Sequence, residues 1–133
     1  MADQLFNLIG AIDAQAELIA AKIVGVGVDF SHEQGTVVTL HGQIVGNKTE
    51  FVKKDRIRGL AITEMEIVFA EQPGVTFVTD SHRSFTEGDR FWYPAGQTDN
   101  MLVQKGQAEM LNNGHSYRVT LRQEKSINLG QDS

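Results

Sequence analysis

A change in hydrophobic period near residue 24 most constrains how this chain can fold. Before it, apolar side chains recur every three or four residues, which is the spacing of one helix face. These residues are Leu5, Leu8, Ile9, Ile12, Ala16, Ile19 and Ile23. After it, apolar side chains occupy alternate positions, Val24, Val26, Val28 and Phe30, which is the period of a β-strand. We predict an N-terminal amphipathic helix over residues 3–22 and a β domain over residues 23–125.

Two interpretations of the helix remain open. Asp3 suits the N-cap, Lys22 suits the last turn, and Gly25 ends the pattern. The simpler interpretation is that the apolar stripe packs on the helix's own domain. The alternative is that the stripe docks on another chain.

The β domain has no alternation of strands with helices, which argues against a doubly wound parallel sheet. Turn sequences separate further expected strands, which are residues 37–44, 60–69, 75–79, 90–93, 101–104 and 117–123. Short strands at this spacing predict a mainly β fold, a small antiparallel β-barrel or sandwich carrying the N-terminal helix. The polar residues 126–133 are expected to form a flexible tail. A chain of 133 residues is long enough for one domain.

Composition excludes several classes of protein. The chain has 12 Lys and Arg against 17 Asp and Glu, a formal net charge of −5, which does not suit coating nucleic acid by bulk charge. It has no cysteine, so disulfides, thiolate zinc sites and cysteine nucleophiles are impossible. No apolar run approaches the about 20 residues that cross a bilayer, and the acidic start does not resemble a secretory signal. We expect no membrane partner.

The residues that could carry chemistry form no recognisable motif. None of His32, His41, His82 and His115 has a partner at the spacing of a helical metal motif. Asp80, Ser81 and His82 have the residue types of a hydrolytic triad, but neighbours in an extended segment point to opposite faces. Glu64 and Glu66 are interpreted as part of a solvated strand face. We therefore expect no enzymatic activity, no cofactor and no metal.

Positive charge gathers in one segment, which is expected to form a loop over residues 48–58. Its cations are Lys48, Lys53, Lys54, Arg56 and Arg58. Three interpretations remain open: a solvated loop or hairpin, a surface that pairs with an acidic neighbouring subunit, or a contact with phosphates. The segment lacks the interleaved aromatic residues of a single-strand binding platform.

Phe85, Phe91, Trp92 and Tyr93 form the densest aromatic cluster. In a strand, Phe91 and Tyr93 share one face while Trp92 lies on the other. We expect Phe91 and Tyr93 in the core. Trp92 belongs either to the core or to an interface.

The order of these features resembles that of the head–tail joining, or stopper, proteins of tailed bacteriophages, in particular the lambda-type family. The similar features are an opening helix, then Phe85-x-x-Gly88-Asp89-x-Phe91, then Gly114-x-x-Tyr117-x-Val119-x-Leu121. The resemblance implies a ring, usually a hexamer, in the virion neck after assembly in the host cytoplasm. It implies as partners copies of the chain itself, portal or adaptor proteins, tail proteins and packaged DNA. The family has no catalytic residues.

The resulting hypothesis is a structural virion protein that joins head to tail and helps to close the DNA channel. Its working surfaces would be the helix stripe, the β-edge strands and the long loops, of which residues 48–58 and 97–107 would be the interface or lumen loops. Two alternatives remain open: another tail component, such as a tail terminator or tube protein, or a small cytosolic β-barrel that binds a ligand or nucleic acid.

Overall fold

The computed structural model describes residues 2–31, 37–73 and 85–128, with side chains from residue 8 onwards. A single α-helix, α1 (Ala2–Val24), comes first, and Gly25 follows it with its backbone N–H donated to the carbonyl of Ala21 at 3.0 Å. The strands are β1 (Val26–Ser31), β2 (Val38–Lys53), β3 (Arg58–Ala70), β4 (Arg90–Trp92), β5 (Met101–Gln104), β6 (Glu109–Leu111) and β7 (Ser116–Asn128). A 3₁₀ turn, η2 (Asn112–Gly114), joins the last two. The expected strand 75–79 and the expected Asp80, Ser81 and His82 lie outside the described residues.

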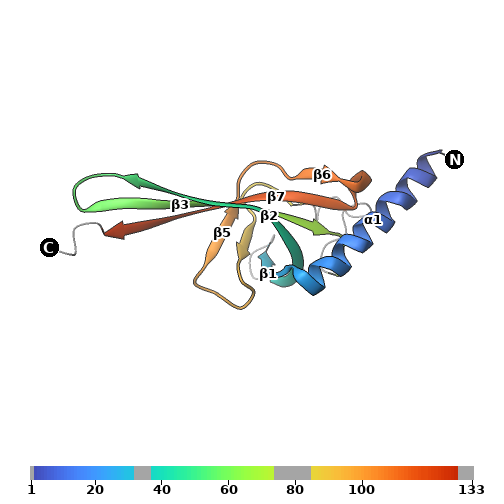
Figure 1. Cartoon of the computed structure of the whole chain (residues 1–133), viewed down its shortest axis with the longest axis horizontal. Coiled ribbons are helices and arrows are strands. Elements are labelled where there is room, and N and C mark those ends of the chain that lie inside the picture. The colour runs from blue at the N-terminus through green and yellow to red at the C-terminus, as the bar shows by residue number, and fades with distance from the viewer. Residues whose placement is uncertain (1, 32–36, 74–84, 129–133) are drawn as a thin grey trace.

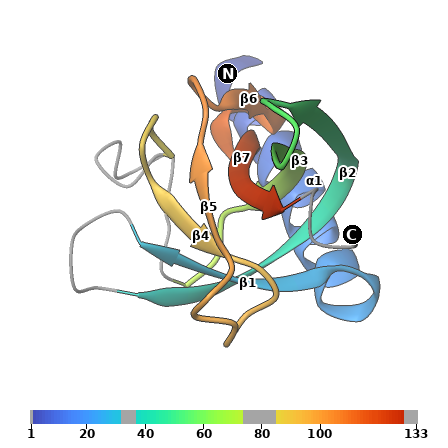
Figure 2. The ribbon, with the colours of Figure 1, turned by 90° about the vertical axis from the view of Figure 1, so that its left-hand side faces the viewer.

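The strands form a closed antiparallel barrel of six strands, in the order β3-β2-β1-β4-β5-β7 (Figure 2). Pairing of β3 with β7, from Arg58↔Asn128 to Ala70↔Ser116, closes the circle, and β6 adds to the outer edge of β7. The predicted fold class, mainly β with an antiparallel barrel and an N-terminal helix, is confirmed.

Aromatic rings fill the barrel. Phe30, Phe69, Phe85 and Phe91 are buried, with ring centroids between 4.9 and 5.9 Å apart for the contacting pairs. Aliphatic side chains complete the core, among them Leu40, Ile67, Leu102, Val119 and Leu121. Tyr93 packs against this cluster. The expectation of a core position is therefore confirmed for Phe91, whereas Tyr93 is half-buried at the edge of the core.

Three strands continue beyond the barrel as an arm (Figure 1). The arm consists of residues 46–53 of β2, 58–66 of β3 and 120–128 of β7, paired as far as Lys53↔Gly59 and Arg58↔Asn128. Residues 48–58 form a β-hairpin, one of the alternatives left open, and not the long loop expected at an interface. The expected tail is corrected for residues 126–128, which are strand. Both segments are polar because both faces of an arm meet solvent, so the alternation of apolar and polar residues that marks a half-buried strand is lost.

The helix presents the opposite face to the one expected. Small residues lie against the barrel and η2: Gly10, Ala14 and Ala21 are buried. Leu8, Ile9, Ile12, Ile19 and Ile23 are exposed instead, while the Leu5 side chain lies outside the described part. The reason is steric, because α1 approaches η2 too closely for larger side chains: a Cβ on Gly10 would lie 2.3 Å from the carbonyl oxygen of Asn112. Glu17 fixes the same contact by accepting a 2.6 Å hydrogen bond from the Asn112 side chain.

Candidate functional site

The tip of the arm is a tight turn organised by one carboxylate. Asp55 accepts hydrogen bonds from the backbone N–H of Ile57 (3.0 Å) and of Arg58 (2.8 Å), and from Nε of Arg58 (2.9 Å). The two backbone donors, and then the Arg58 side chain, lower the pKa of Asp55 below its ordinary value. Because Asp55 engages Arg58, the turn leaves Lys53, Lys54 and Arg56 exposed and without an ion pair to any described residue.

The six residues expected at an interface or lumen fall into three places. Lys53, Lys54, Arg56 and Arg58 gather at the arm tip. Lys48 lies five residues back along β2, about 17 Å away, near Glu64 (4.0 Å). Trp92 is half-buried on β4 of the barrel, with the Arg90 guanidinium carbon 6.0 Å from its ring centroid. The structure does not bring Trp92 together with the cations.

Glu64 organises the base of the arm. Its side chain accepts a hydrogen bond from Lys105 at 3.1 Å, joining β3 to the residue after β5. This hydrogen bond lowers the pKa of Glu64, and the charges of Lys105, Lys48 and Arg122 lower it further. The neighbouring Glu66 is exposed. Glu64 is thus part of an ion-pair cluster rather than of a solvated carboxylate pair.

The arm has two open edges. On the side away from β3, β2 pairs with β1 only as far as Gly42, and β7 pairs with β5 only as far as Arg122. Residues 43–53 and 123–127 therefore have no strand on their outer side within the described part of the chain. Unpaired strand edges are templates for pairing with another chain. Large apolar side chains are exposed beside the β2 edge and at the turn, at Phe51 (72% exposed) and Ile57 (57%).

The exposed stripe of α1 is a second surface, at the other end of the molecule's long axis from the arm tip (Figure 1). Its described apolar residues form one row of exposed side chains along the helix, whereas the small residues Gly10, Ala14 and Ala21 are buried. Because the two surfaces lie at opposite ends, the tip and the helix of one molecule cannot cover each other.

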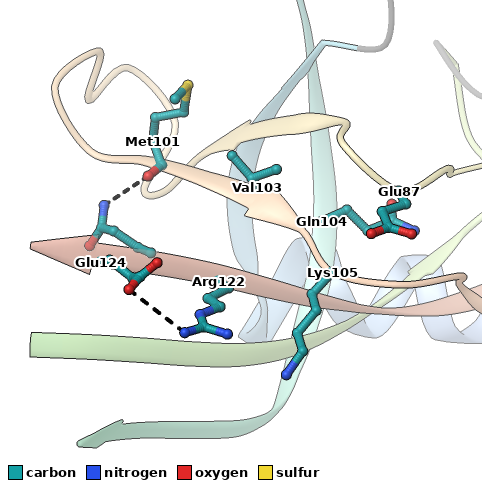
Figure 3. A pocket seen from close by; sticks show the side chains of 8 residues that line it. Glu87, Met101, Val103, Gln104, Lys105, Arg122 and Glu124 are labelled. Carbon is teal, nitrogen blue, oxygen red and sulfur yellow. Dashed lines mark hydrogen bonds and ion pairs between the residues drawn. The ribbon is translucent and has the colours of Figure 1, made fainter. Parts of the chain in front are cut away.

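A groove of about 430 Å³ lies between β5 and β7, where the arm leaves the barrel (Figure 3). Most of the residues that line it are polar or charged: Arg122 lies 3.7 Å from Glu124, and Gln123 donates to the Met101 carbonyl at 2.8 Å. Lys105, also on its wall, is engaged by Glu64. The lining has no Ser, Thr or His, so it offers no hydroxyl or imidazole nucleophile.

The histidines do not assemble a reactive centre in the part of the chain that is described. His115 is buried with its Nδ1 2.8 Å from Glu71, while the backbone of His41 is bonded to Gln72. His32 and His82 lie outside the described residues. Among residues 2–31, 37–73 and 85–128 no group of three or more acidic or histidine side chains could hold a metal ion. The one described helix is not apolar enough over its length to cross a bilayer.

The sequence predicted surfaces on the β-edge strands without giving their positions, and it left open whether the helix stripe faces the barrel or another chain. The positions of the open edges depend on where the barrel closes, and no local sequence pattern predicts that point. The helix carried a usable signal, since Gly10, Ala14 and Ala21 form a second face of small residues suited to close packing.

No protein-family model matches the chain, and neither a curated protein nor a solved structure matches it significantly. Its function is therefore inferred from the two surfaces described above and from the layout of the chain.

Proposed function

We propose that this protein is a structural subunit that forms a ring in the neck of a tailed-phage particle, where it joins head to tail and helps to close the DNA channel. The phage role rests on the layout, an amphipathic helix followed by a compact antiparallel barrel with the Phe85–Phe91 and Gly114–Leu121 patterns. The assembly into a ring rests on the surfaces of the molecule.

The observation that carries the proposal is the arm with its two open edges. The β2 edge and the β7 edge lie on opposite sides of one three-stranded sheet. A contact between one edge of a copy and the other edge of the next copy is head-to-tail, and it leaves a free edge at each end for further copies. Repeated head-to-tail contacts close into a ring when the rotation between copies permits it.

The distribution of charge supports a channel role for the arm tip. The chain as a whole has a net charge of −5, yet Lys53, Lys54 and Arg56 are exposed together on one turn. Cations on a projecting turn can neutralise DNA phosphates without regard to base sequence. In the proposed ring, the tips contact packaged DNA, while the other surfaces of the ring bind portal or adaptor proteins on one side and tail proteins on the other.

Negative-stain electron microscopy of the purified full chain tests the proposal. We expect ring-shaped particles of uniform diameter with a central channel. Long tubes would support the alternative of a tail-tube protein, because there the same contacts would continue without closing. Particles of monomer size only, at every protein concentration, would contradict both.

A further inference from the structure

The outward stripe of α1 contains a heptad pattern. Leu5, Ile9, Ile12, Ala16, Ile19 and Ile23 follow one another at alternating steps of four and three residues, with Leu8 beside them. Such alternating steps are those of the heptad repeat of a coiled coil, in which these residues occupy the a and d positions. Here Ile9, Ala16 and Ile23 are at a, and Leu5, Ile12 and Ile19 are at d.

The barrel makes no use of this seam. Ile9, Ile12, Ile19 and Ile23 are 45%, 55%, 56% and 76% exposed, and Ala16 is exposed as well. The buried residues Gly10, Ala14 and Ala21 are at b and f positions, on the opposite side of the helix. The described part of the seam, from Ile9 to Ile23, runs about 21 Å along α1 and is an apolar surface open to solvent.

A helix is the partner that a heptad seam fits, since each a or d side chain inserts between four side chains of a facing helix. Every copy of the chain carries such a helix, and in a ring all copies point the same way along the axis. We infer that the α1 helices of neighbouring copies pack seam to seam, as a parallel bundle around the ring axis. This inference rests on the proposed ring.

Two details of the sequence favour this arrangement. Isoleucine at both a and d positions favours bundles of more than two strands, as a ring requires. In a parallel bundle, each g residue faces the following e residue of its neighbour, which places Leu8 beside Asp13 and Gln15 beside Ala20. Neither pair sets like charges against each other.

The absence of cysteine makes the arrangement testable by disulfide trapping in the full chain. The variants Ile9→Cys and Ile23→Cys each introduce one thiol at an a position, about 21 Å apart along the helix. In a parallel bundle each variant links to itself under mild oxidation. The matched control is Val24→Cys, because Val24 is as exposed as Ile23 (77% against 76%) but lies off the seam.

We expect at least tenfold faster disulfide formation for Ile9→Cys and Ile23→Cys than for Val24→Cys. Links that form only when the Ile9→Cys and Ile23→Cys proteins are mixed would indicate antiparallel helices and overturn the inference. Disulfide formation by Ile9→Cys and Ile23→Cys at the same rate as by Val24→Cys would also overturn the inferred helix bundle. This holds whether α1 is then free or binds another protein. If such equal rates occur in a protein that still forms rings, the proposed function stands and only the helix bundle fails.

A second variant separates the helix from the arm. The double substitution Ile12→Gln and Ile19→Gln removes apolar contacts from the seam without touching the buried face of α1, and we expect it to lower the oligomer mass. Val24→Gln is the matched control, because it removes an exposed apolar side chain from α1 that lies off the seam and outside the arm. An unchanged mass for the double variant would contradict the bundle.

Discussion

Gly10 of α1 lies directly against the backbone carbonyl of Asn112, so that a Cβ at residue 10 would come within 2.3 Å of that oxygen. The contact holds the helix to η2 on its small-residue face, next to the hydrogen bond between Asn112 and Glu17. With this face committed to the barrel, the large apolar side chains of α1 point away from it. The orientation of the helix, on which the inferred bundle depends, thus originates in this close approach.

Gly10→Ala tests this contact. Alanine favours a helix over glycine by about 1 kcal/mol, but at residue 10 its methyl group would collide with backbone that cannot rotate away. We expect net destabilisation of about 1–3 kcal/mol, measured by urea unfolding followed by circular dichroism. Gly27→Ala is the control, since a Cβ there meets only the Ala95 side chain at 3.5 Å, an ordinary contact. An unfolding midpoint for Gly10→Ala at or above that of the wild type would contradict the geometry.

How α1 packs shows where prediction from the sequence stops. Its existence and its end near Gly25 follow from local spacing and turn chemistry, and both are confirmed. Which face it buries is decided by the distance to η2, a segment about a hundred residues later in the chain. Local periodicity identifies the more apolar face and predicts that this face is buried. That prediction is wrong here, because only small residues allow α1 to approach η2 so closely.

Asp55→Asn tests the turn at the arm tip. The pKa of Asp55 is lowered in the folded protein, so its contribution to stability is present above the ordinary carboxyl pKa and is lost as the pH falls through the lowered value. We expect hydrogen exchange at the amides of Ile57 and Arg58, corrected for the intrinsic pH dependence of exchange, to accelerate in acid. In the Asn variant the corrected rates at neutral pH should be higher than those of the wild type. They should not change further as the pH falls.

The control for that experiment is Glu50→Gln, which removes a carboxylate from the same arm without touching the turn. Its corrected exchange rates at residues 57 and 58 should follow those of the wild type. If Asp55→Asn also follows the wild type at every pH, the carboxylate does not organise the turn.

Two phenylalanines provide a matched comparison of barrel and arm. Phe69 is fully buried, with its ring centroid 5.2 Å from that of Phe85, whereas Phe51 is 72% exposed. Phe69→Ala should cost about 3–5 kcal/mol of unfolding free energy. Phe51→Ala should change it by less than about 0.5 kcal/mol. Urea unfolding of the two variants measures both values, and equal losses would refute the assignment of the core.

The barrel and the arm also differ in how far they could be predicted. Val28, Phe30 and Leu40 alternate with residues outside the core, so their strands are visible in the sequence. Residues 48–58 are dense in charge and resemble a loop, because no core lies beside the arm to impose alternation. Residues 48–53 are strand because they pair with residues 59–64 of β3, for example Lys48↔Glu64, and β3 in turn pairs with β7, which is a long-range contact.

Charge reversal at the arm tip tests its contact with DNA. Lys53→Glu, Lys54→Glu and Arg56→Glu together should abolish binding of the protein to a short DNA duplex at low salt, measured by fluorescence anisotropy. Wild-type affinity should fall steeply with salt, because each neutralised phosphate contributes about −0.9 to the slope of log K against log salt concentration. Lys22→Glu, in the last turn of α1 and outside the arm, should leave the affinity nearly unchanged. No detectable binding by the wild type would remove DNA from the list of partners.

The mass of the full chain in solution tests the central claim, that this protein is a subunit of a closed ring. Sedimentation equilibrium over a wide range of protein concentration measures it without reference to any partner. The account predicts one closed species whose mass is a fixed multiple, greater than two, of the 14.7 kDa chain. A mass of 14.7 kDa at every concentration would contradict it.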